Sequence, residues 1–228
     1  MSPFYGETPY VQHEIETNYR RLFYSRPEQA LITDITLAAG YGILKAGTVL
    51  ALNKSAAGNY NKYVPYNPTT AAYGDPNQVG RAFLIDTPSG TTVNVVLQDS
   101  YKFVVGDDLI IDDDNSAAEN LGAITAIDRT TYVHIAAITV TATISGTFTL
   151  AQNGFVCVEA GDSSNIYSDA VGILGATVDT GLGEKAKGAL APMIRSNAIL
   201  YDGLLTNIDA ASRTDLSATL EGRYLIIK

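Results

Sequence analysis

The sequence contains no tryptophan, one cysteine and two histidines among its 228 residues. The single cysteine, Cys157, cannot form a disulfide within the chain, and we expect it to be a small buried strand residue. No apolar run approaches the roughly 20 residues that a membrane-spanning helix needs. Residues 1–7 hold neither a basic nor an apolar stretch, so no signal peptide is expected. We therefore expect neither a disulfide framework nor a membrane partner.

Positive charge is scarce, most of all in the middle of the chain. Residues 75–160 carry 3 Lys or Arg against 11 Asp or Glu, a net charge of −8 out of −9 for the whole chain. Nucleic-acid binding needs cations that neutralise phosphates, so this region argues against a direct nucleic-acid partner. A dense field of one sign also favours a solvent-facing position.

Catalytic motifs are missing as well. The sequence has no Gly-x-Ser-x-Gly elbow, no phosphate-binding loop and no His-Glu-x-x-His pair. His13 lies in the N-terminal part, and His134 lies in an alternating segment where an exposed or hydrogen-bonded strand histidine is expected. Because no nucleophile–base pair can be named, the sequence predicts a protein that is not an enzyme and has no cofactor.

What the sequence does contain is a β-rich pattern. Alternation over residues 31–37 predicts a half-buried strand, and two more strands over 43–52 and 62–66 flank a polar turn. A change of phase at Ala136-Ala137 predicts a bulge or a break between strands. A short helix is expected over 208–220, with Gly222 after it. Further strands are expected over 91–97, 102–105, 109–111, 123–128, 170–174, 189–194, 198–201 and 224–227.

Two phrases carry a resemblance to a known family. The first runs Leu44-Lys45-Ala46-Gly47-Thr48-Val49-Leu50 and continues to Tyr63-Val64-Pro65-Tyr66; the second is Ala170-Val171-Gly172-Ile173-Leu174. They resemble segments of the lambda-type bacteriophage head decoration proteins, which bind a phage capsid from outside. The resemblance covers roughly residues 30–66 and 168–228. It implies a mainly β fold, with a small β-barrel or β-tulip-like domain, a short helix and an extended N-terminal arm.

The resemblance also implies a domain organisation. Residues 1–30 form the arm, residues 31–75 and 161–228 form a discontinuous core domain, and residues 76–160 form an inserted acidic all-β domain. The spacing of Ile15, Tyr19 and Leu22 predicts a short helix within the arm, over residues 13–23.

The arm is rich in aromatic residues, which favours docking on a partner; packing on the chain's own domain is the alternative. The resemblance makes the partner the phage major capsid protein. The capsid-binding candidates are Phe4, Tyr5, Tyr10, Ile15, Tyr19, Arg20, Arg21 and Phe23.

Clustered carboxylates run from Asp107 to Asp114, and Glu119 follows. Carboxylate oxygens suit a hard cation such as calcium, which makes Asp112 and Asp114 weak metal candidates. The cluster lacks the glycine and the terminal glutamate spacing of an EF-hand loop. We therefore expect a solvated acidic turn and assign no metal.

The function that the resemblance implies is that of a structural virion protein on the outer surface of a capsid. It would form a homotrimer at three-fold positions and stabilise the expanded head. The alternative is a tail- or fibre-associated β-domain protein whose middle module binds a host surface glycan. The aromatic candidates for that binding are Tyr60, Tyr63, Tyr66 and Tyr73.

Overall fold

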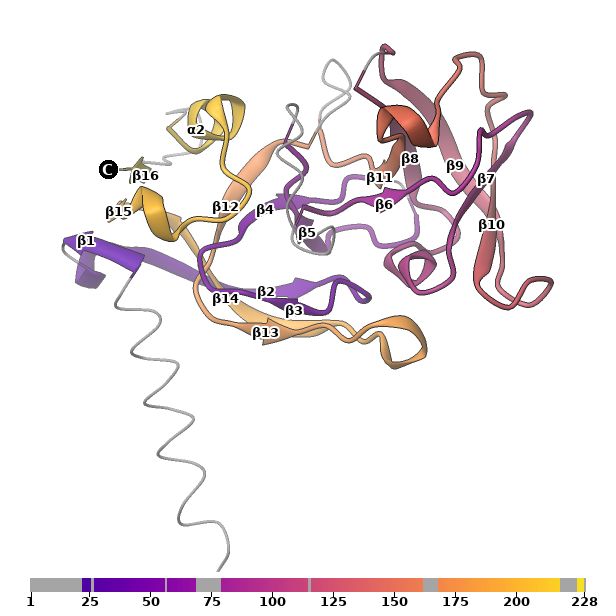
Figure 1. Ribbon diagram of the computed structural model, residues 1–228. Helices are drawn as coiled ribbons and strands as arrows, with labels where there is room; N and C mark the ends of the chain where they lie inside the picture. Colours follow the sequence, from indigo (N-terminus) through magenta and orange to yellow (C-terminus); the bar gives the residue numbers. More distant parts are fainter. Residues whose placement is uncertain are drawn as a thin grey trace, which may run out of the picture.

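The computed structural model describes residues 22–25, 27–55, 57–68, 79–114, 116–161, 168–217 and 225–227. Strands dominate these residues, and α2 (Ala210–Ser217) is the one α-helix among them. The strands form two larger sheets and two small ones (Figure 1). The mainly β prediction is confirmed.

Five strands from two distant parts of the sequence close a barrel in the order β12–β14–β2–β5–β4 (Figure 1). Leu50 of β4 lies opposite Gly172 of β12, and Leu37 of β2 lies opposite Tyr63 of β5. Strands β4 and β5, which hold parts of the first phrase, and β12, which holds the second, are therefore in one sheet. The strands are β2 (Leu31–Leu37), β4 (Val49–Leu52), β5 (Tyr63–Pro65), β12 (Ala170–Leu174) and β14 (Ala189–Ser196).

The second large sheet is built entirely from residues 82–158, in the order β6–β11–β8–β9–β10–β7. A bridge between Leu84 and Val95 brings its two edges together, so this six-stranded sheet is nearly closed. No strand pair among the described residues joins it to the barrel. The strands are β6 (Ala82–Phe83), β7 (Thr92–Val96), β8 (Asp108–Asp112), β9 (Glu119–Asp128), β10 (Ile135–Val140) and β11 (Phe155–Val158).

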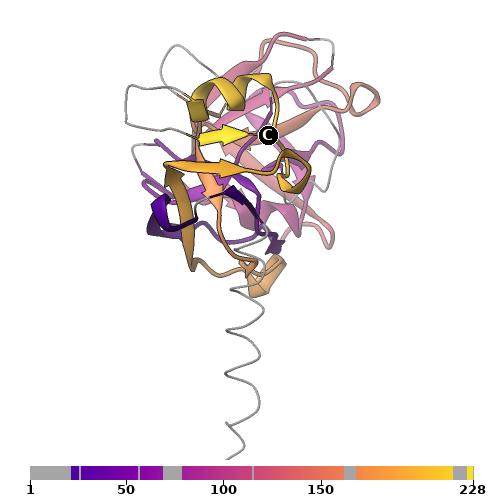
Figure 2. The ribbon, with the colours of Figure 1, turned by 90° about the vertical axis from the view of Figure 1, so that its left-hand side faces the viewer.

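A three-stranded sheet has β15 (Ala198–Leu200) at its centre, with β1 (Phe23–Ser25) on one side and β16 (Leu225–Ile227) on the other. This sheet and α2 lie at the end of the molecule away from the six-stranded sheet (Figures 1 and 2). The other small sheet pairs β3 (Ile43–Leu44) with β13 (Val178–Asp179).

Two capping residues, Asp209 and Ser212, determine where helix α2 starts. The Ser212 amide donates to Oδ1 of Asp209 at 2.7 Å, and the Asp209 amide donates to Oγ of Ser212 at 2.8 Å. This reciprocal pair satisfies two backbone donors that the first turn of a helix leaves free. The expected helix is present over residues 210–217 with Asp209 as its cap, whereas residues 218–220 of the expected range lie outside the described residues.

Three local predictions were wrong. The strand expected over 43–52 is two strands, because Gly47 (φ 93°) turns the chain between β3 and β4. Residues 102–105 form no strand; a 3₁₀ turn, η3 (Asp99–Lys102), ends there. No bulge occurs at Ala136-Ala137: buried and half-buried residues alternate without a break through β10, and Val133 lies before the strand with 79% of its surface exposed.

The barrel and the six-stranded sheet share a core. One cluster of buried side chains extends from Leu37 and Val49 of the barrel to Val95 and Ile138 of the other sheet. The backbones also approach closely: a Cβ added to Gly40 would lie 2.5 Å from the carbonyl oxygen of Tyr101. The two sheets are therefore packed against each other as one body.

Candidate functional site

The predicted arm residues fall on both sides of the boundary of the described chain. Phe4, Tyr5, Tyr10, Ile15, Tyr19, Arg20 and Arg21 lie outside the described residues, as does most of the helix expected over 13–23. Phe23 lies inside them, in β1, where it pairs with Leu200 of β15 and keeps only 5% of its surface exposed. Phe23 thus packs on its own chain, and β1 forms the base of the expected arm.

An exposed apolar patch surrounds this base. The rings of Tyr24 and Tyr201 meet edge to face, with centroids 5.2 Å apart, and both side chains remain about half exposed. Leu204 follows in the turn after Tyr201 and is also exposed. We call Tyr24, Tyr201 and Leu204 the β1 patch. Exposed apolar clusters of this kind are typical of interaction surfaces.

The described acidic residues of this segment lie in different environments. Among the described residues, no group of three or more His, Cys, Asp or Glu side chains is placed to hold a metal ion. Asp112 is a buried residue of β8, whereas Asp114 is exposed and accepts a hydrogen bond from Nδ2 of Asn153 at 2.6 Å. The expected solvated position therefore holds for Asp114 but not for Asp112 and Asp113, which are both buried.

A different carboxylate, Asp107, has a central structural place. It is fully buried and accepts four hydrogen bonds, one from the Val104 amide, one from Asn53 and two from Asn59. Asn53 and Asn59 belong to the loop between β4 and β5 of the barrel, whereas Asp107 precedes β8. Burial raises the pKa of Asp107, and the hydrogen bonds act in the opposite direction. This carboxylate connects the barrel to the six-stranded sheet.

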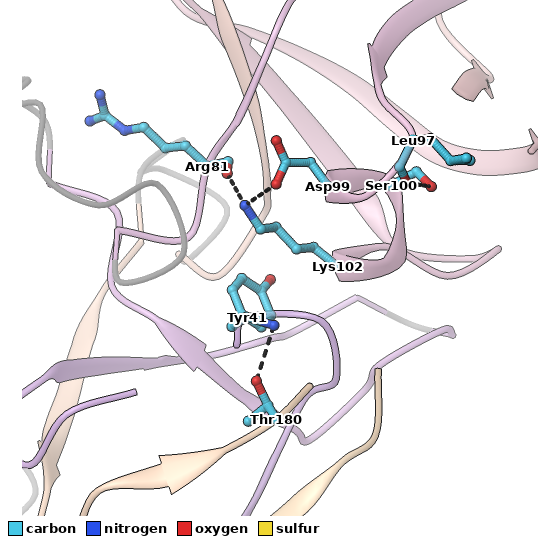
Figure 3. A network of polar contacts seen from close by, with 7 residues as sticks. All are labelled: Tyr41, Arg81, Leu97, Asp99, Ser100, Lys102 and Thr180. Atoms are coloured by element: carbon cyan, nitrogen blue, oxygen red, sulfur yellow. Dashed lines mark hydrogen bonds and ion pairs between the residues drawn. The ribbon is translucent and has the colours of Figure 1, made fainter. Parts of the chain in front are cut away.

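Two buried cations lie beside the same junction. Nζ of Lys102 donates to the carbonyl oxygen of Arg81 at 2.6 Å and lies 2.9 Å from Oδ1 of Asp99 (Figure 3). The guanidinium of Arg81 lies 4.0 Å from the ring centroid of Phe155 and donates to the side chain of Asn67. Both cations are thus held by contacts within the chain, which indicates a structural role.

Two further residues considered in the sequence, Cys157 and His134, lie in different environments. Cys157 is a free, buried cysteine in β11, as expected, and burial raises its pKa to about 12. His134 is exposed and precedes β10 instead of lying within a strand; its carbonyl accepts a hydrogen bond from the Leu97 amide at 2.9 Å.

The tyrosines proposed for glycan binding do not form one platform. Tyr66 is fully buried, and its hydroxyl donates to Asp209 at 3.1 Å. Tyr63 is half-buried and Tyr60 is exposed, while Tyr73 lies outside the described residues. The burial of Tyr66 removes it from any ligand-binding surface.

The structure places a groove elsewhere, where the two sheets meet. Its volume is about 460 Å³. Val96, Leu97, Gln98 and Tyr101 line it from β7 and η3, and His134 adds to this side. Residues 182–184, at the start of the 3₁₀ turn η5 (Gly183–Lys185), line the barrel side. No local sequence pattern indicates this groove, because three separated segments build it.

Comparison with known proteins adds no identification: no family model, no curated protein and no solved structure matches the chain. Within the part of the chain that the structure describes, no helix has the length and apolar character of a membrane span.

Proposed function

We propose that this protein is a structural virion protein that binds the outer surface of a bacteriophage capsid and stabilises the expanded head. The observation that carries the proposal is the strand order of the barrel. The resemblance to head decoration proteins rests on residues 44–50, 63–66 and 170–174. Within these segments, β4 holds residues 49–50, β5 holds residues 63–65 and β12 holds residues 170–174, and the three strands lie in one closed sheet. The adjacency of β12 to β4, across more than a hundred residues of sequence, supports treating the two segments as parts of one module.

The position of β1 supports a binding role for the segment before it. Because β1 is an edge strand, its pairing with β15 anchors residues that directly follow the aromatic segment 1–21. The β1 patch adds exposed apolar surface at the same end. An anchored aromatic segment can bury apolar surface on a shell or add a strand to an exposed sheet edge. In a homotrimer, three such segments would multiply a weak contact through avidity.

The charge distribution is consistent with this orientation. The acidic residues are concentrated in the region that forms the six-stranded sheet, which lies at the end away from β1 and β15 (Figure 1). If the β1 end faces the shell, the acidic sheet points outward into solvent. Like charge there would also discourage attached copies from aggregating.

Binding to expanded heads tests the proposal. Purified protein mixed with empty expanded heads is examined by negative-stain microscopy and co-sedimentation, and its mass in solution is measured by analytical ultracentrifugation. We expect a trimer that adds regular density to the heads. A monomer that leaves the heads undecorated would contradict the proposal.

Deletion of residues 1–21 tests the role of the arm separately. We expect this variant to keep its circular dichroism spectrum and melting temperature and to lose head binding. A Tyr24→Ala, Tyr201→Ala double variant should weaken binding, whereas Tyr132→Ala, at an exposed tyrosine of the six-stranded sheet region, serves as the control. Full binding by the deletion variant would refute the role of the arm.

A further inference from the structure

The groove between the two sheets has the composition of a small-molecule site. Val96, Leu97 and Leu182 supply apolar walls, and Tyr101 supplies an aromatic ring. Its volume of about 460 Å³ falls within the range of roughly 300–1,000 Å³ that is typical of ligand pockets. Such pockets combine apolar walls with a few polar groups that fix the orientation of the ligand, and they occur preferentially where two structural units meet.

The polar groups at this groove are suited to hydroxyl groups. Gln98 offers both a donor and an acceptor, His134 offers two ring nitrogens that can form hydrogen bonds, and Glu184 offers acceptors. A hydroxyl group both donates and accepts, so it can pair with each of the three. A molecule with several hydroxyls on an otherwise apolar ring matches this alternation of apolar and polar surface.

The local charge argues against an anionic ligand. Among the described residues that line the groove, Glu184 is the only one with a charged acidic or basic side chain, so an anion would meet no cation there. The nearby Arg129 is already engaged: it donates to Oγ and the carbonyl oxygen of Ser100, and its guanidinium lies 4.6 Å from the centroid of the Tyr101 ring. The net charge of −9 on the whole chain disfavours anions further.

The walls of the groove are fixed by backbone hydrogen bonds. On one side the Leu97 amide donates to the His134 carbonyl at 2.9 Å. On the other side the Lys185 amide donates to the Leu182 carbonyl at 3.1 Å, which closes the η5 turn. A preformed site loses less conformational entropy when a ligand binds.

We propose that this groove binds a neutral saccharide, one or two sugar rings in size, with a ring against Tyr101 and its hydroxyls on Gln98, His134 and Glu184. The proposal does not depend on capsid binding, because the groove is complete within one chain. It gives the inserted sheet and the barrel a shared binding site, since each supplies part of the lining.

Saccharide binding to the full-length protein tests this inference. The probes are neutral mono- and disaccharides of glucose, galactose, mannose and N-acetylglucosamine, screened by saturation-transfer NMR and titrated by calorimetry. Glucuronate is the anionic comparison. We expect at least one neutral probe to bind and glucuronate to bind more weakly.

Rim variants assign the binding to this groove. Gln98→Ala and His134→Ala change exposed side chains, so both variants should fold normally. Each should weaken binding by about 2- to 10-fold, the effect of one net hydrogen bond. Tyr132→Ala, exposed near His134 but outside the lining, should leave binding unchanged.

Three results would overturn the inference: no binding of any neutral probe, preferential binding of glucuronate, or binding that neither rim variant weakens. Head binding is measured in a separate assay, so the capsid proposal can fail or stand on its own.

Discussion

Two buried tyrosines show how much one hydrogen bond can matter at the residue scale. Tyr41 and Tyr66 both have no exposed surface, and burial raises the pKa of each well above its ordinary value. The Tyr66 hydroxyl donates to Asp209, the cap of α2. The Tyr41 hydroxyl has no hydrogen-bond partner among the described residues. A buried hydroxyl without a partner loses its hydrogen bonds to water and gains no hydrogen bond in the folded protein.

The same substitution should therefore have opposite effects at these two positions. Tyr41→Phe should raise the free energy of unfolding by about 1 kcal/mol, because it removes an unpaired hydroxyl. Tyr66→Phe should lower it by about 1–2 kcal/mol, because the carboxylate of Asp209 loses a donor. Urea unfolding of both variants measures the difference. A Tyr41→Phe variant that is destabilised as much as Tyr66→Phe would contradict this account.

The buried thiol of Cys157 predicts a loss of stability at alkaline pH. Burial raises its pKa from 9.0 to about 12 in the folded chain. Above pH 9 the unfolded thiol therefore ionises while the folded one stays protonated. The stability that the protonated thiol contributes is complete below pH 9 and declines as pH rises towards 12, by up to about 1.4 kcal/mol per pH unit.

The measurement is the free energy of unfolding between pH 8 and pH 11 for the wild type and Cys157→Ala. Tyrosines also titrate in this range, so the difference between the two proteins isolates the thiol. We expect the gap between them to narrow as pH rises. A constant gap would mean that the thiol ionises as easily in the fold as outside it.

At the scale of elements, the sequence predicted those strands whose conformation is determined by neighbouring residues. Alternation over residues 31–37 gave β2 with its bounds, and the apolar run over 170–174 gave β12. Predictions failed where a distant contact decides the conformation. Residues 102–105 have strand-like composition, yet Lys102 ends a 3₁₀ turn and its ammonium is held by Arg81 and Asp99.

The candidate sites were harder to predict than the strands. Asp107 stood out only as one carboxylate of an acidic run, because its partners Asn53 and Asn59 lie about fifty residues away in the sequence. The groove could not be predicted from the sequence for the same reason, since no local pattern links Gln98, His134 and Glu184. Local periodicity carries no information about which loops meet.

Gly40 allows a loop of the barrel to approach η3, and this contact can be tested. At φ 91° and with the Tyr101 carbonyl oxygen 2.5 Å from any added Cβ, Gly40→Ala would suffer both backbone strain and a clash with backbone atoms. We expect it to lower the free energy of unfolding by more than about 2 kcal/mol.

Gly90→Ala is the matched control for Gly40→Ala. Its φ is 65°, but nothing lies within 4 Å of an added Cβ. It carries the strain without the clash, so its cost should be about 1 kcal/mol. Equal costs for the two variants, measured by thermal or urea unfolding, would show that the close approach contributes nothing.

At the scale of the whole molecule, two separate sheets are joined by a shared core and by Asp107. Loss of this carboxylate leaves Asn53, Asn59 and the Val104 amide without their acceptor on both sides of the junction. Because both sheets contribute to this junction, we expect a substitution that destabilises one sheet to destabilise the other as well.

Asp107→Ala should destabilise both sheets together, by roughly 2–4 kcal/mol. Hydrogen exchange followed by mass spectrometry should show faster exchange in β9 and β10 and also in β2 and β14. Asp34→Ala, at an exposed position of β2, should change neither. Faster exchange confined to the six-stranded sheet would mean that the two sheets open independently.

The three-stranded sheet has a practical consequence for attaching cargo to this protein. Because β1 and β16 both pair with β15, a tag fused after β16 would emerge beside the base of the aromatic segment and could obstruct its contacts. The turn at Ser89 and Gly90, between β6 and β7, is exposed and belongs to the sheet at the other end of the molecule. A peptide or fluorescent label inserted at that turn would leave the β1 end uncovered, which makes it the better position for display.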